Sequence, residues 1–180
     1  LWIRLLETGD ASTAKQFAVE FEMIANPTWP MPHARETIEL LRQQNLRLGL
    51  ISNAQFYTPH LFDLFFKAPI EALGFDPDLM FFSYIHGRAK PSPVMFSKAA
   101  GRIRQFGLPA AAAVYVGNDM RNDIVPARNA GFQTVLFAGD RRSLRLREND
   151  PDCAGAAPDL VITDLAQLPA YTKSINNKDS

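Results

Sequence analysis

The sequence has little cysteine and no net charge. Its 180 residues include one cysteine, Cys153, and nineteen Lys and Arg balance nineteen Asp and Glu. A single cysteine forms no internal disulfide, so nothing indicates an oxidising compartment, and a cytoplasmic location is expected. Without net charge, no overall field draws the chain to nucleic acid or anionic lipid, so we predict neither a nucleic-acid partner nor a membrane partner.

A methionine at the first position and a long apolar run are also missing. The opening residues, LWIRLLETGD, lack the basic start and the small-residue cleavage site of a secretory signal. No apolar run approaches the roughly 18 residues that a membrane span needs. We therefore expect a soluble chain that is either a fragment or has had its start removed.

The remaining composition is typical of a globular protein, with 47% hydrophobic and 21% charged residues. The length predicts one domain with a small appendage. Apolar residues at helical spacing predict a helix over 13–24, and the proline-rich segment 29–32 that follows predicts a boundary at residue 32.

After this boundary, predicted helices alternate with predicted strands. This order favours an α/β fold, a Rossmann-like parallel sheet with helices on both faces, over residues 33–172. The polar residues 173–180 are expected to form a flexible tail. The predicted helices are 33–45, 58–66, 93–106 and 123–130, and the predicted strands are 46–51, 79–84, 113–116, 134–138 and 160–163.

Two predicted segments bring single polar residues to the edge of this sheet. Ser52 and Asn53 end the strand 46–51, where a hydroxyl and backbone N–H groups can bind phosphoryl oxygens. The alternative is that both residues only shape the turn. Lys90, in the segment GRAKP, precedes the helix 93–106 and could neutralise a phosphoryl group. The alternative is a solvated loop lysine.

The third segment, GNDMRND at residues 117–123, carries several oxygen ligands. Asn118, Asp119 and Asp123 follow an apolar strand within seven residues, which suits a hard cation such as Mg²⁺ that keeps several waters. The alternative is that these acids cap the helix that follows, and both roles are compatible.

Together, Ser52 with Asn53, Lys90 in GRAKP, and GNDMRND with the trailing IVPARNAGF resemble the second, third and fourth motifs of the haloacid dehalogenase-like (HAD) hydrolase superfamily. The resemblance implies Mg²⁺-dependent hydrolysis of a small phosphorylated metabolite through an aspartyl intermediate. It implies that Ser52 and Asn53 hold the phosphoryl oxygens, that Lys90 neutralises them, and that residues 1–32 end a helical cap.

The sequence departs from this family in two ways. The fourth motif has Asn118 where many members have aspartate, so the metal ligands are either Asp119 with Asp123, which we favour because both are charged, or Asn118 with Asp123. The first motif, an apolar strand ending in Asp-x-Asp, is absent. The pairs at 76 and 78 and at 150 and 152 come too late in the chain.

Without this nucleophile we expect the chain by itself to be catalytically inert. The family places the missing strand between the strand that ends at Ser52 and the one that ends at Gly117. We therefore predict that these two strands either leave a gap or pair directly with each other.

Three alternatives remain open. A carbon-halide hydrolase of the same superfamily would work without Mg²⁺. A non-catalytic receiver-like module would share clustered acids and a lysine, although in another order. Separately, the basic run RRSLRLR at 141–147 is expected to be a solvated loop, with a polyanion or partner site as the alternative.

Overall fold

The computed structural model describes residues 9–176, and the chain divides into two compact units between Pro30 and Met31. The first unit contains helix α2 (Ala11–Ala25), as the sequence predicts for 13–24. Its start is fixed by Asp10, whose side chain accepts hydrogen bonds from the backbone N–H groups of Ser12 and Thr13. The helix ends just ahead of Pro27, which cannot donate to it.

The second unit is an α/β fold with parallel strands, as predicted. Its elements in chain order are α3 (Ala34–Gln43), β1 (Leu48–Ser52), α4 (Thr58–Phe66), β2 (Phe75–Phe82), α5 (Ser83–His86), α6 (Val94–Gln105), η1 (Ala110–Ala112), β3 (Val114–Gly117), the π-helical turn η2 (Met120–Ile124), α7 (Val125–Asn129), β4 (Gln133–Phe137), η3 (Pro151–Cys153), β5 (Leu160–Ile162), η4 (Leu165–Gln167) and α8 (Leu168–Asn176).

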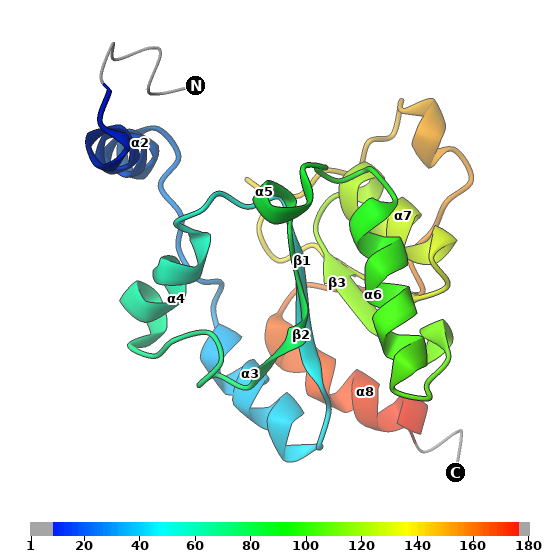
Figure 1. Ribbon diagram of the computed structural model, residues 1–180. Helices are drawn as coiled ribbons and strands as arrows, with labels where there is room; N and C mark the ends of the chain where they lie inside the picture. Colours follow the sequence, from blue (N-terminus) through cyan, green and yellow to red (C-terminus); the bar gives the residue numbers. More distant parts are fainter. Residues whose placement is uncertain (1–8, 177–180) are drawn as a thin grey trace. The chain divides into compact units, whose positions relative to one another are not determined.

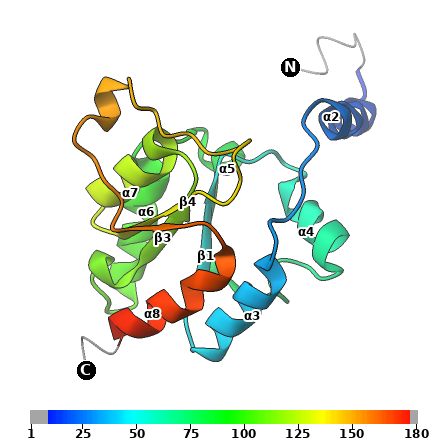
Figure 2. The same cartoon turned by 180° about the vertical axis from the view of Figure 1, so that it is seen from behind.

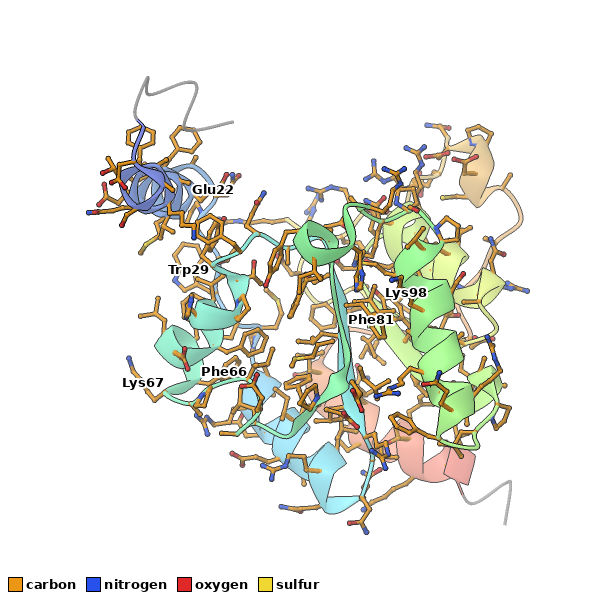
Figure 3. The ribbon with its side chains drawn as sticks, in the orientation of Figure 1. Glu22, Trp29, Phe66, Lys67, Phe81 and Lys98 are labelled. Carbon is orange, nitrogen blue, oxygen red and sulfur yellow. The ribbon has the colours of Figure 1, made fainter. Side chains whose placement is uncertain are left out.

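Helices cover the strands on two faces (Figures 1 and 2). On one face, α6 and α7 pack against β2, and Figure 3 shows Phe81 of β2 close to α6. On the other face, Leu41 of α3 and Leu168 of α8 pack against β4 and β5. The alternating apolar residues of the strands therefore enter two separate apolar layers, as expected when a parallel sheet is buried on both sides.

The strands form two sheets rather than one. β1 pairs only with β2, and β3 pairs with β4, which pairs with β5. Among the described residues no backbone hydrogen bond joins β1 to β3, and a cavity of about 380 Å³ is lined by both strands. Its walls are mostly apolar and include Leu50 and Val116. Of the two arrangements predicted for these strands, a gap or direct pairing, the structure has the gap.

Three details differ from the predictions. β2 begins at Phe75 rather than at residue 79, because Arg47 and Arg102 pair with the carboxylates of Asp76 and Asp78, which accommodates these acids in a strand. The chain then turns into α5 at Ser83, where the strand was expected to continue to residue 84.

The polar tail expected from residue 173 is helical as far as Asn176, because α8 buries Leu168 and Thr172, which are one helical turn apart. Thr172 also donates a hydrogen bond to the side chain of Gln44 at 2.8 Å. Residues 177–180 lie outside the described part of the chain. Within residues 9–176, no helix has both the length and the apolar character needed to cross a bilayer.

Candidate functional site

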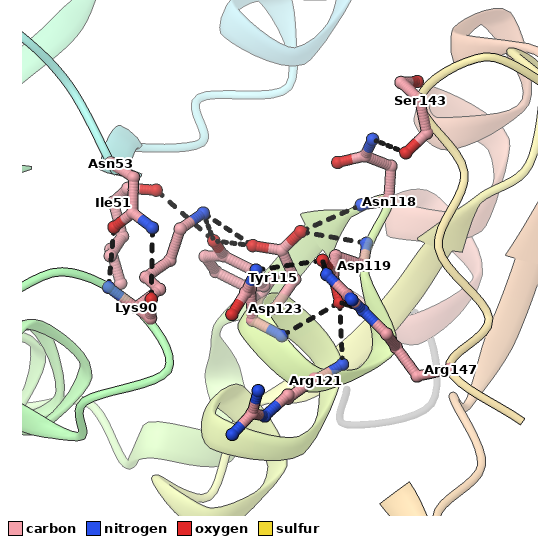
Figure 4. A network of polar contacts seen from close by, with 11 residues as sticks. Ile51, Asn53, Lys90, Tyr115, Asn118, Asp119, Arg121, Asp123, Ser143 and Arg147 are labelled. Atoms are coloured by element: carbon pink, nitrogen blue, oxygen red, sulfur yellow. Dashed lines mark hydrogen bonds and ion pairs between the residues drawn. The ribbon is translucent and has the colours of Figure 1, made fainter. Parts of the chain in front are cut away.

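The three polar segments predicted from the sequence meet at the carboxyl ends of β1 and β3 (Figure 4). Lys90 joins them. Its side chain is only 13% exposed, and its Nζ donates to Asp123 Oδ1 at 2.6 Å and to the Tyr115 hydroxyl at 3.1 Å. An ammonium group has three N–H donors. Within residues 9–176 the third donor of Lys90 has no partner, so it is available to a ligand.

Asn53 connects the second motif to the third. Its side chain accepts a hydrogen bond from the backbone N–H of Lys90 at 2.6 Å and donates one to the Lys90 carbonyl oxygen at 3.1 Å. This pairing fixes the backbone of Lys90 and uses one donor and one acceptor position of the amide. By contrast, the neighbouring Ser52 Oγ has no hydrogen-bond partner among the described residues.

Asp123 is held from two sides in the turn that follows β3. Its Oδ2 accepts hydrogen bonds from the backbone N–H groups of Asn118 and Asp119, both at 3.1 Å, while its Oδ1 faces Lys90. The carboxylate lies directly against Gly117, where a Cβ atom would overlap it. The glycine is therefore required by the close approach of Asp123 to the strand end.

Tyr115 is a site residue that the sequence interpretation missed. Its hydroxyl donates to Asp123 Oδ1 at 3.0 Å and lies 3.3 Å from the Ile51 carbonyl oxygen, so that it bridges the two sheets. Burial, together with the nearby Asp123 carboxylate, raises the pKa of the Tyr115 phenol well above its usual value. The available signal was the strand alternation, which places residues 115 and 117 on one face.

Asp119 faces away from Lys90 and pairs with Arg147. The guanidinium donates from Nε to Oδ1 at 3.1 Å and from Nη2 to Oδ2 at 2.7 Å, and the same carboxylate accepts from the backbone of Arg121 and Asn122. Burial alone would raise the pKa of Asp119, but the hydrogen bonds from Arg147 and from the backbone outweigh it and lower the pKa.

Asn118 lies between these two acids in the motif. Its Nδ2 donates to the Ser143 carbonyl oxygen at 2.7 Å, and its Oδ1 has no hydrogen-bond partner in the described part of the chain. The motif therefore contains one free amide oxygen and two carboxylates, each paired with a cation.

This donor set does not fit Mg²⁺ by itself. Lys90 neutralises Asp123 and Arg147 neutralises Asp119, so the motif offers no excess negative charge to a divalent cation. Residues 9–176 contain no cluster of three or more His, Cys, Asp or Glu side chains that could hold a metal ion. The assignment of Asn118, Asp119 and Asp123 as metal ligands thus stays a prediction.

The two Asp-x-Asp pairs of the described chain lie elsewhere. Asp76 and Asp78 are in the first half of β2, opposite the carboxyl edge, and pair with arginines. Asp150 and Asp152 pair with Arg121. Neither pair approaches Lys90, in keeping with their exclusion as nucleophiles from their position in the sequence.

Comparisons with known proteins all point to the same family. Residues 87–168 match a family model described as HAD-hydrolase-like. The chain is 31% identical over 140 residues to a ribulose-1,5-bisphosphate 5-phosphatase of Halopiger xanaduensis, covering 77% of this chain and 54% of the relative. It is 28% identical over 170 residues to a phosphoglycolate phosphatase of Haemophilus influenzae, covering 91% and 67%. The chain thus spans about half to two thirds of the length of these relatives.

Solved structures agree. A HAD phosphatase from Thermococcus onnurineus superimposes with a TM-score of 0.63 at 20% identity, covering 94% of this chain and 67% of that one. A 2-haloacid dehalogenase from Pseudomonas syringae superimposes with a TM-score of 0.61 at 27% identity, covering 97% and 69%. With the three motifs gathered at one edge of a parallel sheet, these similarities support the HAD-like hydrolase superfamily for this chain.

Proposed function

We propose that this protein takes part in hydrolysing a phosphate monoester of a small metabolite, with the described residues supplying the phosphoryl-binding side of the site. One observation carries the proposal. Asn53 fixes the backbone of Lys90, and Asp123 orients its ammonium group, which keeps one N–H free. Ser52, whose hydroxyl has no partner among the described residues, directly precedes Asn53 in the chain. A fixed cation binds phosphoryl oxygens well because charge-assisted hydrogen bonds are strong.

The relatives support the substrate class. Those named for ribulose-1,5-bisphosphate, phosphoglycolate and glyceraldehyde 3-phosphate all act on a phosphate ester of a small carbon skeleton. The proposal extends this class, though not any one of these substrates, to the present chain.

Mg²⁺ and an aspartyl intermediate remain parts of the proposal that the family resemblance implies. The candidate metal residues are Asn118, Asp119 and Asp123, with Asp119 and Asp123 preferred from the sequence. Both carboxylates pair with cations in this structure, so no reaction step through the metal is assigned to them. They account for binding, charge neutralisation and orientation of the phosphoryl group.

Binding of inorganic phosphate tests the site without requiring a nucleophile. We expect phosphate to raise the melting temperature of the chain, and this shift to disappear in Lys90→Met. The matched control, Lys98→Met, removes an exposed lysine of α6 and should keep the shift. An equal shift in Lys90→Met would count against the proposed site.

Hydrolysis is tested on protein expressed from the complete reading frame, with p-nitrophenyl phosphate in the presence and absence of Mg²⁺. Loss of a positioned charge of this kind typically lowers kcat by about 10²–10³. Lys90→Met should show a loss of this size, and undiminished turnover in this variant would contradict the assigned role.

A carbon-halide hydrolase is the second candidate, favoured by the 27% identity to the 2-haloacid dehalogenase structure. Such an activity would release chloride from 2-chloropropionate without Mg²⁺. Chloride release with no release of phosphate from p-nitrophenyl phosphate would replace the first proposal by this one.

A further inference from the structure

The basic run 141–147 is an exposed loop, as the sequence predicts, but its backbone is bonded to the fourth motif. Arg145 lies alongside the fourth motif in a parallel bridge with Asp119. The backbone N–H of Arg145 donates to the Asn118 carbonyl oxygen, and the N–H of Met120 donates to the Arg145 carbonyl oxygen, both at 2.9 Å. The loop is therefore attached by its backbone to the segment that carries the candidate site.

The attachment continues on both sides of this bridge. Ahead of it, Asp140 accepts hydrogen bonds from the N–H groups of Arg142 and Ser143, and the Ser143 carbonyl oxygen accepts from the Asn118 side chain. Leu144 packs against the buried cluster that includes Met120. We refer to residues 140–147 as the 140–147 loop. These contacts hold it against the fourth motif.

The loop ends in the ion pair between Arg147 and Asp119. The Asp119 side chain is 10% exposed and the Arg147 side chain 37%, so the carboxylate is buried while the guanidinium covers it. Arg147 has a positive φ of 56°, a left-handed conformation that a non-glycine residue adopts only when its surroundings enforce it. Both planar groups meet in the two-bond geometry that is specific to arginine.

We propose that Arg147 is a positioning residue that controls the orientation of Lys90 through Asp119 and Asp123. This inference rests on the proposed phosphoryl-binding role of Lys90.

The physical route has three steps. Arg147 holds the Asp119 carboxylate where it also accepts the N–H groups of Arg121 and Asn122, which fixes the turn η2. The fixed turn directs the Asp119 N–H, with that of Asn118, at Asp123 Oδ2. The other oxygen of Asp123 then holds Lys90.

Removing the guanidinium leaves a buried carboxylate without its counter-charge, and Asp119 would turn toward water. Its cap on the turn would be lost at the same time, and with it the geometry that aims Asp123 at Lys90. Arg121 provides a matched control, because it belongs to the same region but pairs with Asp150 and Asp152 rather than with Asp119.

The experiment measures the rate at which an N-hydroxysuccinimide ester acylates Lys90, relative to exposed Lys98, by mass spectrometry at fixed pH and well below the melting temperature. Arg147→Met should raise this ratio roughly tenfold, the size of change expected for coupled neighbours. Asp119→Asn should raise it similarly, the double variant no further, and Arg147→Lys less. Arg121→Met should leave it unchanged.

A purely structural role would lower the melting temperature without changing the acylation ratio below it. An unchanged ratio in Arg147→Met, or an equal rise in Arg121→Met, overturns the inference. The acylation ratio can be measured even if the protein neither binds nor releases phosphate. A failure of the proposed function is therefore distinguishable from a failure of this inference.

Discussion

Replacing Lys90 by methionine keeps the length of the side chain and removes its charge, which leaves the Asp123 carboxylate buried without a counter-ion. The two side chains are 13% and 5% exposed. Breaking a buried ion pair from one side typically costs about 3–5 kcal/mol. Asp123 keeps hydrogen bonds from Asn118, Asp119 and Tyr115, so we expect the lower end of this range, about 3 kcal/mol.

For a chain of this size, this destabilisation corresponds to a fall in melting temperature of roughly 6–12 °C. Urea unfolding followed by circular dichroism gives the free energy of unfolding directly. Lys98→Met, at an exposed position of α6, is the matched control and should change the free energy by less than about 0.5 kcal/mol.

A double-mutant cycle isolates the pair. Asp123→Asn alone is also destabilising. In Asp123, Oδ1 accepts from Lys90 and Oδ2 accepts from two backbone N–H groups, whereas an amide has only one oxygen that can accept. The double variant should recover part of this loss, with a coupling energy of about 2 kcal/mol. Additive losses, or a loss below about 1 kcal/mol in Lys90→Met, would refute the reasoning.

Two further predictions concern stability. The hydrogen bond to Asp164, with the charge of that carboxylate, raises the pKa of His33 above 6.5, while backbone and His33 hydrogen bonds lower the pKa of Asp164 below 3.8. The stabilisation from His33 is therefore complete at a pH below the pKa of His33 in the unfolded chain, and it is lost as the pH rises through the pKa of His33 in the folded chain. The stabilisation from Asp164 is lost as the pH falls through the pKa of Asp164 in the folded chain. The melting-temperature difference between the native chain and His33→Gln should thus be largest near pH 5 and shrink above about pH 7, and a pH-independent difference contradicts this account. Gly117→Ala should lower the free energy of unfolding by about 1–3 kcal/mol because its methyl group overlaps Asp123. In Gly101→Ala, inside α6, the methyl group meets only Arg104 Nη2 at an ordinary contact distance of 3.9 Å, so the free energy should rise by roughly 0.5–1 kcal/mol. Changes of equal sign in the two variants would contradict the packing.

Much of the fold was predictable because its signal is local. The 3.6-residue and two-residue periods predicted α4, α6, β3 and β4 to within about two residues of their bounds. The bounds of β2 and α8 were harder to predict from the sequence. Asp76 in β2 depends on Arg47, from another strand, and Thr172 of α8 is buried by contacts with the distant α3. Such partners are not visible in a local pattern.

The candidate site divides in the same way. Lys90, Ser52 and the fourth motif were found from the residue types that follow each strand. Tyr115 was missed, since a tyrosine in an apolar strand is usually a core residue, and only the packing of β3 beside β1 brings its hydroxyl to Lys90. The exposure of the 140–147 loop was predicted, but its attachment to the fourth motif was not, since a run of arginines carries no sign of the acid that it meets.

From the sequence alone it followed that strands alternate with helices and that three polar segments reach one edge of the sheet, while β1 and β3 were expected either to leave a gap or to pair directly. These features follow from periodicity and from the order of the motifs. Which carboxylate faces which cation depends on tertiary packing. Asp119 and Asp123 are four residues apart in one turn and chemically identical, yet Asp119 pairs with Arg147 and Asp123 with Lys90. Both cations come from distant parts of the chain, 28 and 33 residues away, so their placement depends on how the strands pack and not on the local sequence.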